Sequence, residues 1–278
     1  MDARELRNHI EGINALPTIP GALRNIVRVV ENPRTSLSEI GSFISKDPVL
    51  VSRVLKVVNS PIYGFSGRIS SVNQALLLLG LSIVRGMLFG VSVFEIMEKT
   101  MVGLWGHSMG CAVAARIIAQ KKGLEEPEEI SVAALLHDIG KVAFSLKFPE
   151  DYGALIGATA ERKMFLFEAE EEHFGVTHAK AGAWICEKWN FPRGLVEMIG
   201  YHHKPHLSKN VPVQTAVVHL ADVLIRAKGF GFGGDNFVPP LSQSAWRLLD
   251  LAEEDLREIV CEVDEALAGS GDFLFPDE

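Results

Sequence analysis

Apolar residues recur along this chain at the spacing of one helical face, whereas the alternation of a half-buried strand is hard to find. Positions 23, 26, 27 and 30 are apolar and follow the i, i+3, i+4, i+7 rule of an amphipathic helix. A second run of inward-facing apolar residues covers positions 50–58. No run of alternating β-branched residues stands between turn-forming pairs in the sequence. The pattern predicts an all-α protein.

Capping residues mark where several of these helices begin and end. The signals are the capping box Ser36-x-x-Glu39, the N-cap pair Asp47-Pro48, the start Ser71-x-x-Gln74 and the end Lys121-Lys122-Gly123. A helix through Trp105 and Ala115 is expected before that end, and later helices over about 128–139, 161–173, 178–189, 192–201, 212–228 and 243–268. The glycine-rich segment 230–237 has no Gly-Lys-Ser/Thr after it, so a flexible connection is favoured over a phosphate-binding loop.

The most apolar stretch, residues 75–94, has to be assigned either to a membrane span or to the protein core. Arg85 at its centre would cost roughly 2.5–3.5 kcal/mol on insertion into a bilayer. Gly80, Gly86 and Gly90 interrupt the same stretch. We therefore expect two buried core helices joined near Gly80, and no membrane partner.

Length and composition indicate a globular protein, either with two lobes or with one large helical domain. The 278 residues exceed the usual size of one domain, and a hydrophobic content of 47% is enough for a sizeable core. We place an N-terminal helical lobe over residues 1–100 and a second helical lobe over residues 101–278. The last part of the second lobe, 228–278, is expected to be a loop followed by helices.

Charge and cysteine content narrow the partners and the compartment. The 27 basic and 35 acidic side chains give a net charge of −8, which disfavours a nucleic-acid partner but leaves room for a local phosphate-binding pocket. Cys111, Cys186 and Cys261 are far apart and form no C-x-x-C pair. Scattered thiols, together with the lack of a signal-peptide pattern in residues 1–20, predict a cytoplasmic protein.

The stretch 135–141, Leu-Leu-His-Asp-Ile-Gly-Lys, is the most informative for chemistry. His137 and Asp138 follow an apolar helical face, where an isolated charge would be costly. A metal ion held by both side chains would compensate the carboxylate and use the neutral imidazole. Lys141 lies one turn after His137 and would reach a bound phosphate. A capped helix end would explain the His-Asp pair by itself about as well.

A second carboxylate, Asp222, stands within the apolar run 217–225 and needs a strong partner. A hydrogen bond between helices would serve, but a metal shared with Asp138 explains both acids together. Further histidines stand on or end separate predicted helices: His107, His178, His202 and His203. His178 follows the N-cap candidate Thr177, where a lone histidine is more often part of the core. The remaining histidines are interpreted as structural or surface residues: His9, His173, His206 and His219.

The order His107 … His137-Asp138 … His178 … His202-His203 … Asp222 resembles the HD phosphohydrolase superfamily. The continuation Ile139-Gly140-Lys141 resembles the HD-GYP branch, which hydrolyses cyclic diguanylate. A more specific pattern resembles the HDOD family, the HD-related output domain. It consists of Leu16-Pro17-Thr18-Ile19-Pro20, Asp47-Pro48, Asn59-Ser60-Pro61 and Leu79-Gly80. This resemblance covers roughly residues 11 to 225 and implies an HD-type helical bundle with an additional N-terminal lobe.

The resemblance also implies a metal centre. It makes His107, His137, Asp138 and Asp222 the ligands of one metal. Asp138 would bridge to a second metal held by His178, His202 and His203, and Asp138 and Lys141 would be the catalytic residues of an active enzyme. A dinuclear centre of Fe or Mn is favoured, with Zn, Ni or Co as alternatives.

Two departures from the HD-GYP pattern bear on function. No Gly-Tyr-Pro loop follows His203, and Gly103 stands where trinuclear members carry a glutamate. The main expectation is a signalling module that binds protein partners and a nucleotide or phosphate ligand, with metal as structural support. The alternative is a metal-dependent phosphohydrolase acting on a nucleotide or another phosphorylated small molecule. A nucleic-acid-responsive regulator is a third hypothesis, which the net charge of −8 supports poorly.

Overall fold

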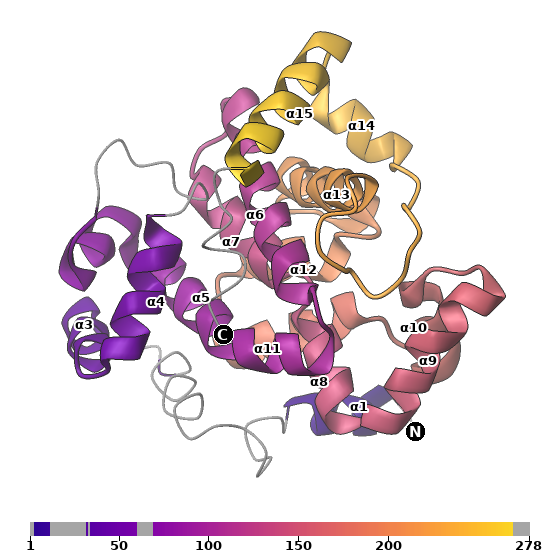
Figure 1. The fold of residues 1–278 in the computed structure, drawn as a ribbon, viewed down its shortest axis with the longest axis horizontal. Coiled ribbons are helices and arrows are strands. Elements are labelled where there is room, and N and C mark those ends of the chain that lie inside the picture. The colour runs from indigo at the N-terminus through magenta and orange to yellow at the C-terminus, as the bar shows by residue number, and fades with distance from the viewer. Residues whose placement is uncertain (1–2, 12–31, 33, 60–68, 269–278) are drawn as a thin grey trace.

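The structure is a computed structural model that describes residues 3–11, 32, 34–59 and 69–268. The expected helix at 23–30, the Leu16–Pro20 motif and Ser60-Pro61 lie outside the described residues. The described elements are helices (Figure 1), and their bounds are α1 (Ala3–Glu11), α3 (Leu37–Ser45), α4 (Pro48–Val58), α5 (Val72–Thr100), α6 (Leu104–Lys121), α7 (Pro127–Leu136), α8 (Ile139–Lys147), α9 (Pro149–Arg162), α10 (Leu166–Phe174), α11 (His178–Lys188), α12 (Arg193–Tyr201), the 3-10 turn η2 (Pro205–Leu207), α13 (Pro212–Ala227), α14 (Gln243–Leu249) and α15 (Glu253–Ala268). The all-α prediction is confirmed.

The capping signals of the N-terminal lobe act as the sequence predicts. Ser36 and Glu39 form the reciprocal capping box at the start of α3. The Asp47 carboxylate accepts a hydrogen bond of 3.1 Å from the backbone N–H of Leu50 at the start of α4. Ser71 caps the start of α5 in the same way. These contacts satisfy backbone donors that have no partner within the helix.

Helix α5 joins the N-terminal helices to the rest of the molecule. It changes direction at Gly80, whose φ of 78° lies in the left-handed region, so the predicted pair of helices joined near Gly80 is confirmed. Its second half packs on α7 so closely that a Cβ at Gly86 would lie 2.3 Å from Val132 Cγ1. Among the described residues, none of the helices combines the length and apolarity that a bilayer span requires.

The predicted helix at 128–139 is wrong at its C-terminal end. Helix α7 ends at Leu136, and a separate helix, α8, begins at Ile139. His137 and Asp138 therefore form the turn between two helices instead of continuing one helix. Gly140 lies against α11, where a Cβ would lie 2.0 Å from the His178 carbonyl oxygen, so only glycine permits this approach.

Two other predicted helices are each divided in the structure. The segment 161–173 spans the end of α9 and most of α10, because Lys163 adopts the left-handed conformation and ends α9. The segment 243–268 is divided into α14 and α15, because Asp250 adopts the same conformation. A non-glycine residue at positive φ carries little sequence signal, since most residue types avoid it. The sequence therefore predicted one continuous helix where the structure has two.

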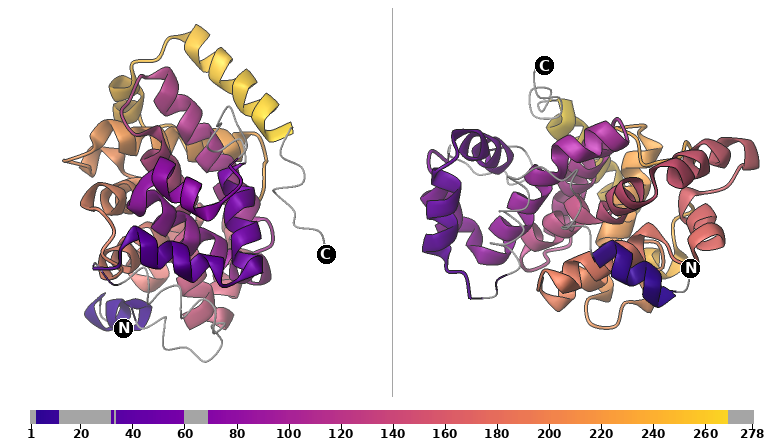
Figure 2. Two further views of the ribbon diagram at one scale, coloured as in Figure 1. Left: turned by 90° about the vertical axis from the view of Figure 1, so that its left-hand side faces the viewer. Right: turned by 90° about the horizontal axis from the view of Figure 1, so that it is seen from below.

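Helix α6 lies at the centre of the second lobe and is buried on nearly all sides. It packs against α7, α13 and α15, while α11 packs against α8 and α12 (Figure 1). Helices α3 and α4 lie on one side of the molecule, and α9 and α10 lie on the opposite side (Figure 2). One cluster of buried apolar side chains extends from Leu6 to Leu267. The boundary placed between residues 100 and 101 remains a prediction.

Candidate metal centre

The structure brings together all the ligand-type residues singled out from the sequence. The seven residues come from five parts of the chain: α6, the turn between α7 and α8, the start of α11, the turn after α12, and α13. Their side chains are almost completely withdrawn from solvent. The set is His107, His137, Asp138, His178, His202, His203 and Asp222.

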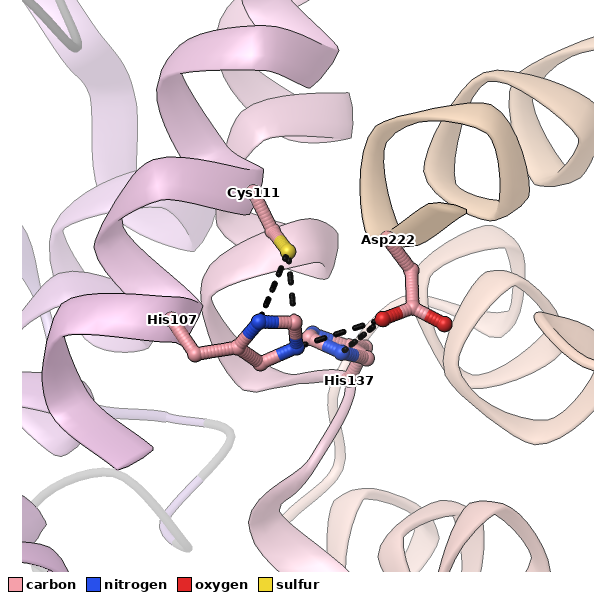
Figure 3. Close-up of side chains that lie close together, drawn as sticks. All are labelled: His107, Cys111, His137 and Asp222. Carbon is pink, nitrogen blue, oxygen red and sulfur yellow. Dashed lines mark hydrogen bonds and ion pairs between the residues drawn. The ribbon is translucent and has the colours of Figure 1, made fainter. Parts of the chain in front are cut away.

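A first cluster forms where α6 faces α13 (Figure 3). His107 Nε2 lies 3.2 Å from Asp222 Oδ1 and 3.5 Å from Asp138 Oδ2. His137 Nε2 lies 3.3 Å from Asp138 Oδ2 and 3.9 Å from Asp222 Oδ1. Two imidazole nitrogens and two carboxylate oxygens thus point toward one small volume.

A second cluster forms around His178. Its Nε2 atom lies 2.9 Å from His203 Nε2 and 3.2 Å from Asp138 Oδ1. Ligand atoms of His178, His202 and His203 all lie within 4.8 Å of one another. The two oxygens of Asp138 therefore face different clusters, which is the position of a bridging carboxylate.

Three of the histidines use one ring nitrogen to fix their orientation. The Nδ1 atoms of His137 and His202 lie 2.6 Å and 2.7 Å from the carbonyl oxygens three residues earlier in the chain. His178 Nδ1 lies 2.6 Å from a carboxylate oxygen of Glu170. Because an oxygen acceptor requires a hydrogen on Nδ1, the neutral form of each ring has its Nε2 lone pair directed into the cluster. This is the usual second contact of a metal-binding histidine.

Several buried polar atoms of the two clusters have no hydrogen-bond partner: His137 Nε2, Asp138 Oδ1, His202 Nε2 and Asp222 Oδ2. An unsatisfied buried polar atom costs about 1–3 kcal/mol, and more when it is charged. Four such atoms converging on one region need a common explanation. A divalent metal ion fits this donor set, because imidazole nitrogen and carboxylate oxygen are both ordinary ligands of Zn, Fe and Mn.

For four of the ligand-type residues the electrostatics favour the protonation states that a metal requires. Burial lowers the pKa of His202 and His203 well below the ordinary value, and the neighbouring histidines lower it further, so both rings are neutral. Burial alone would raise the pKa of Asp138 and Asp222, but nearby histidines outweigh it and hold both well below the ordinary value. Neutral imidazoles and ionised carboxylates are the forms that bind metal.

Lys141 is buried beside the first cluster. Its ammonium donates to Asp138 Oδ2 at 2.6 Å and to the carbonyl oxygen of Gly233 at 2.6 Å. The sequence led us to expect this cation to face a bound phosphate. In the structure its contacts are with the protein, and a role toward phosphate remains a prediction.

The segment 230–237 is an ordered cover over His107, so the expectation of a flexible connection is wrong. The backbone N–H of Phe232 donates to the Gly103 carbonyl at 2.9 Å. A Cβ at Gly231 would lie 2.2 Å from the backbone nitrogen of His107. Asp235 accepts from the backbone of Leu166 and from the guanidinium of Arg226. The glycines permit a close backbone approach here, which sequence reasoning interpreted as flexibility.

Glu170 is a site residue that the sequence did not reveal. Its carboxylate is fully buried and accepts from the Tyr152 hydroxyl and from both the backbone N–H and Nδ1 of His178, each at 2.6 Å. Burial alone would lower the pKa of His178, but the charge of Glu170 outweighs it and raises that pKa. Glu170 belongs to an acidic stretch, 168–172, that has the composition of a solvated helix face. The sequence offered one signal, because Glu170 stands eight residues before the candidate ligand His178.

Cys111 and His219 also lie beside the ligands. Cys111 Sγ lies 3.6 Å from His107 Nε2 and, with His107, His137 and Asp222, forms a buried group able to hold a metal. His219 Nδ1 lies 2.7 Å from the carbonyl oxygen of His202, and its Nε2 accepts from the backbone N–H of Ser242. Those contacts agree with the structural role assigned to His219.

The ligands adjoin a surface groove and a smaller pocket. The groove, of about 630 Å³, is lined by Arg162, Met164, Phe167, Glu168, Glu171, Glu172 and Lys204. The Phe167 ring stacks on His203 with ring centroids 4.4 Å apart, so one wall residue of the groove contacts the second cluster. The pocket, of about 120 Å³, lies between His107 and the segment 229–237. The groove therefore adjoins the second cluster, and the smaller pocket adjoins the first.

Comparison with known proteins places these observations in a family. The HDOD domain profile matches residues 16–205. An uncharacterized protein of Treponema pallidum (strain Nichols) is 30% identical over 219 residues, which is 77% of this chain and 43% of that protein. The chain thus spans less than half the length of that relative.

Solved structures share the same fold. An HDOD domain protein of unknown function from Geobacter sulfurreducens matches with a TM-score of 0.71 at 26% identity, over 99% of this chain and 100% of that one. A Marinobacter aquaeolei VT8 protein provisionally assigned to signal transduction matches with a TM-score of 0.69 at 21% identity, over 98% of this chain and 63% of that one. A provisional phosphohydrolase from Shewanella amazonensis SB2B matches with a TM-score of 0.62 at 21% identity, over 96% and 95% of the two chains.

Proposed function

This chain belongs to the HDOD family, and we propose that it is a regulatory module of a bacterial signalling system whose second lobe is stabilised by a divalent-metal centre. The observation that carries the proposal is the convergence of four buried, unpartnered ligand atoms from the α7–α8 turn, the turn after α12 and α13. A regulatory module needs a defined folded state that partners can recognise. A metal held between separate helices would supply that state by linking binding to folding.

The donor arrangement supports two metal positions that share Asp138. The first would be held by His107, His137, Asp138 and Asp222, whose atoms lie 3.2–3.9 Å apart. The second would be held by Asp138 with the histidines that surround its other oxygen: His178, His202 and His203. Imidazole and carboxylate donors favour Fe or Mn, and Zn, Ni and Co also accept them.

A metal-dependent phosphohydrolase is the second candidate, favoured by the bridging position of Asp138 and by the groove beside His203. Divalent metals supply Lewis acidity toward phosphoryl oxygens. Lys141 would then have to exchange its contacts for a phosphate, yet its ammonium is already engaged by Asp138 and Gly233. The segment 230–237 also packs directly over His107. These contacts favour a regulatory role over phosphate hydrolysis.

We further propose that the module acts in the cytoplasm with a signalling protein as its partner. Its cysteines are unpaired, as expected for a reducing compartment: Cys111, Cys186 and Cys261. The groove beside His203 is the place where a nucleotide or phosphate ligand would reach the metal centre.

The test compares metal-free and metal-loaded protein. Protein stripped with a chelator and then given Fe²⁺, Mn²⁺ or Zn²⁺ should unfold at a higher temperature than the stripped protein. Ligand at 100 times its Kd stabilises the folded state by about 2.7 kcal/mol. The loaded protein should not turn over a panel of phosphodiesters and phosphomonoesters. Identical melting curves would refute the metal centre, and turnover lost in His137→Ala would establish the phosphohydrolase instead.

A further inference from the structure

Cys111 occupies a position on α6 that the family pattern does not explain. It lies one helical turn after His107, so both side chains are on the same face of the helix. The cysteine is completely buried. Its Sγ atom lies 3.6 Å from Nε2 and 3.9 Å from Nδ1 of His107, and it points toward the first cluster (Figure 3).

The group around this sulfur is compact enough to hold one metal ion. The ligand atoms of His107, Cys111, His137 and Asp222 all lie within 4.8 Å of one another. In a tetrahedral site with metal–nitrogen bonds of about 2.0 Å and metal–sulfur bonds of about 2.3 Å, nitrogen and sulfur are about 3.5 Å apart. The observed 3.6 Å between Cys111 Sγ and His107 Nε2 agrees with that separation.

One further atom of this group needs a partner. His137 Nε2 is buried and has none. Asp138, the other carboxylate beside the first cluster, is already engaged at Oδ2 by the Lys141 ammonium at 2.6 Å. Its Oδ1 atom faces His178 in the second cluster. If Asp138 serves the second metal alone, the first position has three donors, and Cys111 is the fourth ligand-type side chain of its group.

We propose that Cys111 is a thiolate ligand of the first metal, completing a closed site with His107, His137 and Asp222. This inference rests on the proposed metal centre and revises its donor set, because Cys111 replaces Asp138 at the first metal and Asp138 is left to the second. Binding replaces the S–H bond by a sulfur–metal bond, and the proton passes to the solvent buffer. A thiolate selects a soft or borderline ion, so this position takes Zn²⁺, Fe²⁺ or Co²⁺ in preference to Mn²⁺ or Mg²⁺.

Four protein ligands without an open position are typical of structural metal sites. The first position would hold α6, the α7–α8 turn and α13 together, in keeping with a regulatory module. Any exchangeable ligand would then be bound at the second position, beside the groove and His203. The two positions would differ in metal preference as well as in access.

The competing explanation is that Cys111 is a small core residue with a weak S–H contact to the His107 ring. Its similar distances to the two ring nitrogens place the sulfur over the ring face. Ligation therefore requires the thiol to turn toward Nε2 about its Cα–Cβ bond. The two explanations differ in one measurable quantity, which is sulfur at bonding distance from the metal.

The first experiment needs no variant. X-ray absorption at the metal edge of Zn²⁺-loaded or Co²⁺-loaded full-length protein should show a sulfur shell at about 2.3 Å, beside nitrogen and oxygen at about 2.0–2.2 Å. The Co²⁺-loaded protein should also show a sulfur-to-cobalt charge-transfer band in the near ultraviolet. Bound metal with only nitrogen and oxygen neighbours would overturn the proposal while leaving the metal centre intact. Failure to bind either metal would overturn both.

Variants then assign the sulfur. The band should disappear in Cys111→Ala and Cys111→Ser and persist in Cys186→Ala, an equally buried cysteine outside the ligand groups found among the described residues. Cys111→Ser should weaken Zn²⁺ binding by at least the roughly 10–100-fold that loss of an outer-shell partner costs a metal site, and Mn²⁺ binding much less. If both Cys111 variants fail to fold, the absorption spectrum of the natural protein still decides. A band retained in folded Cys111→Ala would refute the assignment.

Discussion

The substitution Glu170→Gln tests whether the contacts behind the ligands tune the metal centre. Glu170 accepts three hydrogen bonds at 2.6 Å, two of them from His178, and it is fully buried. Glutamine has nearly the same shape but no charge. It can still accept from His178 through its carbonyl oxygen, while its amide donates to the oxygen of Tyr152. The fold should therefore survive, and the electrostatic support of His178 should be lost.

The expected magnitude follows from the role of the carboxylate. Loss of an outer-shell partner lowers metal affinity about 10–100-fold. That range corresponds to about 1.4–2.7 kcal/mol of binding free energy. Because Glu170 acts on His178, the effect should fall on the second metal position, while the first position, around His107, keeps its affinity.

The assay is competition for metal between the protein and a chromophoric chelator at neutral pH. Two binding steps should be resolved. In Glu170→Gln only the step that fills the second metal position should lose affinity. Tyr152→Phe is the matched control, because it removes one hydrogen bond to Glu170 and leaves the charge facing His178. Equal affinity of the natural protein and Glu170→Gln for both metals would refute the reasoning. So would an equally large loss in Tyr152→Phe.

Three further predictions concern pH, substrate and lobe packing. Burial disfavours the charge of Glu197, but hydrogen bonds from Asn210 and Ser208 outweigh it and lower its pKa from 4.5 to about 2. Since the folded state favours the ionised form, stability on the order of 2 kcal/mol should be present above pH 4.5 and be lost as the pH falls toward 2, and acid unfolding of Glu197→Gln should lack this component. Metal-loaded protein should not hydrolyse cyclic diguanylate, because no Gly-Tyr-Pro loop follows the paired histidines; turnover abolished by His137→Ala would contradict this. The fragment 101–278 should be poorly soluble or unfolded alone, because five side chains of α5 buried at about 1.5–3 kcal/mol each would stabilise the contact by roughly 10 kcal/mol. A cooperative melt of the fragment as a stable monomer would show the lobes to be independent.

Local signals in the sequence predicted much of the fold. Hydrophobic periodicity and capping pairs such as Ser36–Glu39 act within a few residues, so they can be read without knowing the tertiary structure. The convergence of Asp138 and Asp222 was expected for a different reason. A carboxylate in an apolar helical run needs a strong partner, and two such carboxylates indicate a shared one.

What the sequence did not reveal depends on tertiary contacts. Glu170 lies in an acidic stretch, and its burial depends on α9 and α11 covering it. Cys111 lies in an apolar helix, where a thiol is ordinarily a core residue. The glycines of segment 230–237 have the composition of a flexible loop, yet they permit backbone contact with His107. Helices α9 and α14 end at Lys163 and Asp250, because these non-glycine residues adopt left-handed backbone conformations.

The most direct test of the metal centre is elemental analysis of protein purified without added metal. We predict bound divalent transition metal in the natural protein and its loss in Asp138→Ala and Asp222→Ala. Asp264→Ala is the matched control, since that carboxylate is exposed and pairs with Lys228; it should retain the full metal content. A natural protein without metal, or equal metal in the natural protein and Asp138→Ala, would contradict the account.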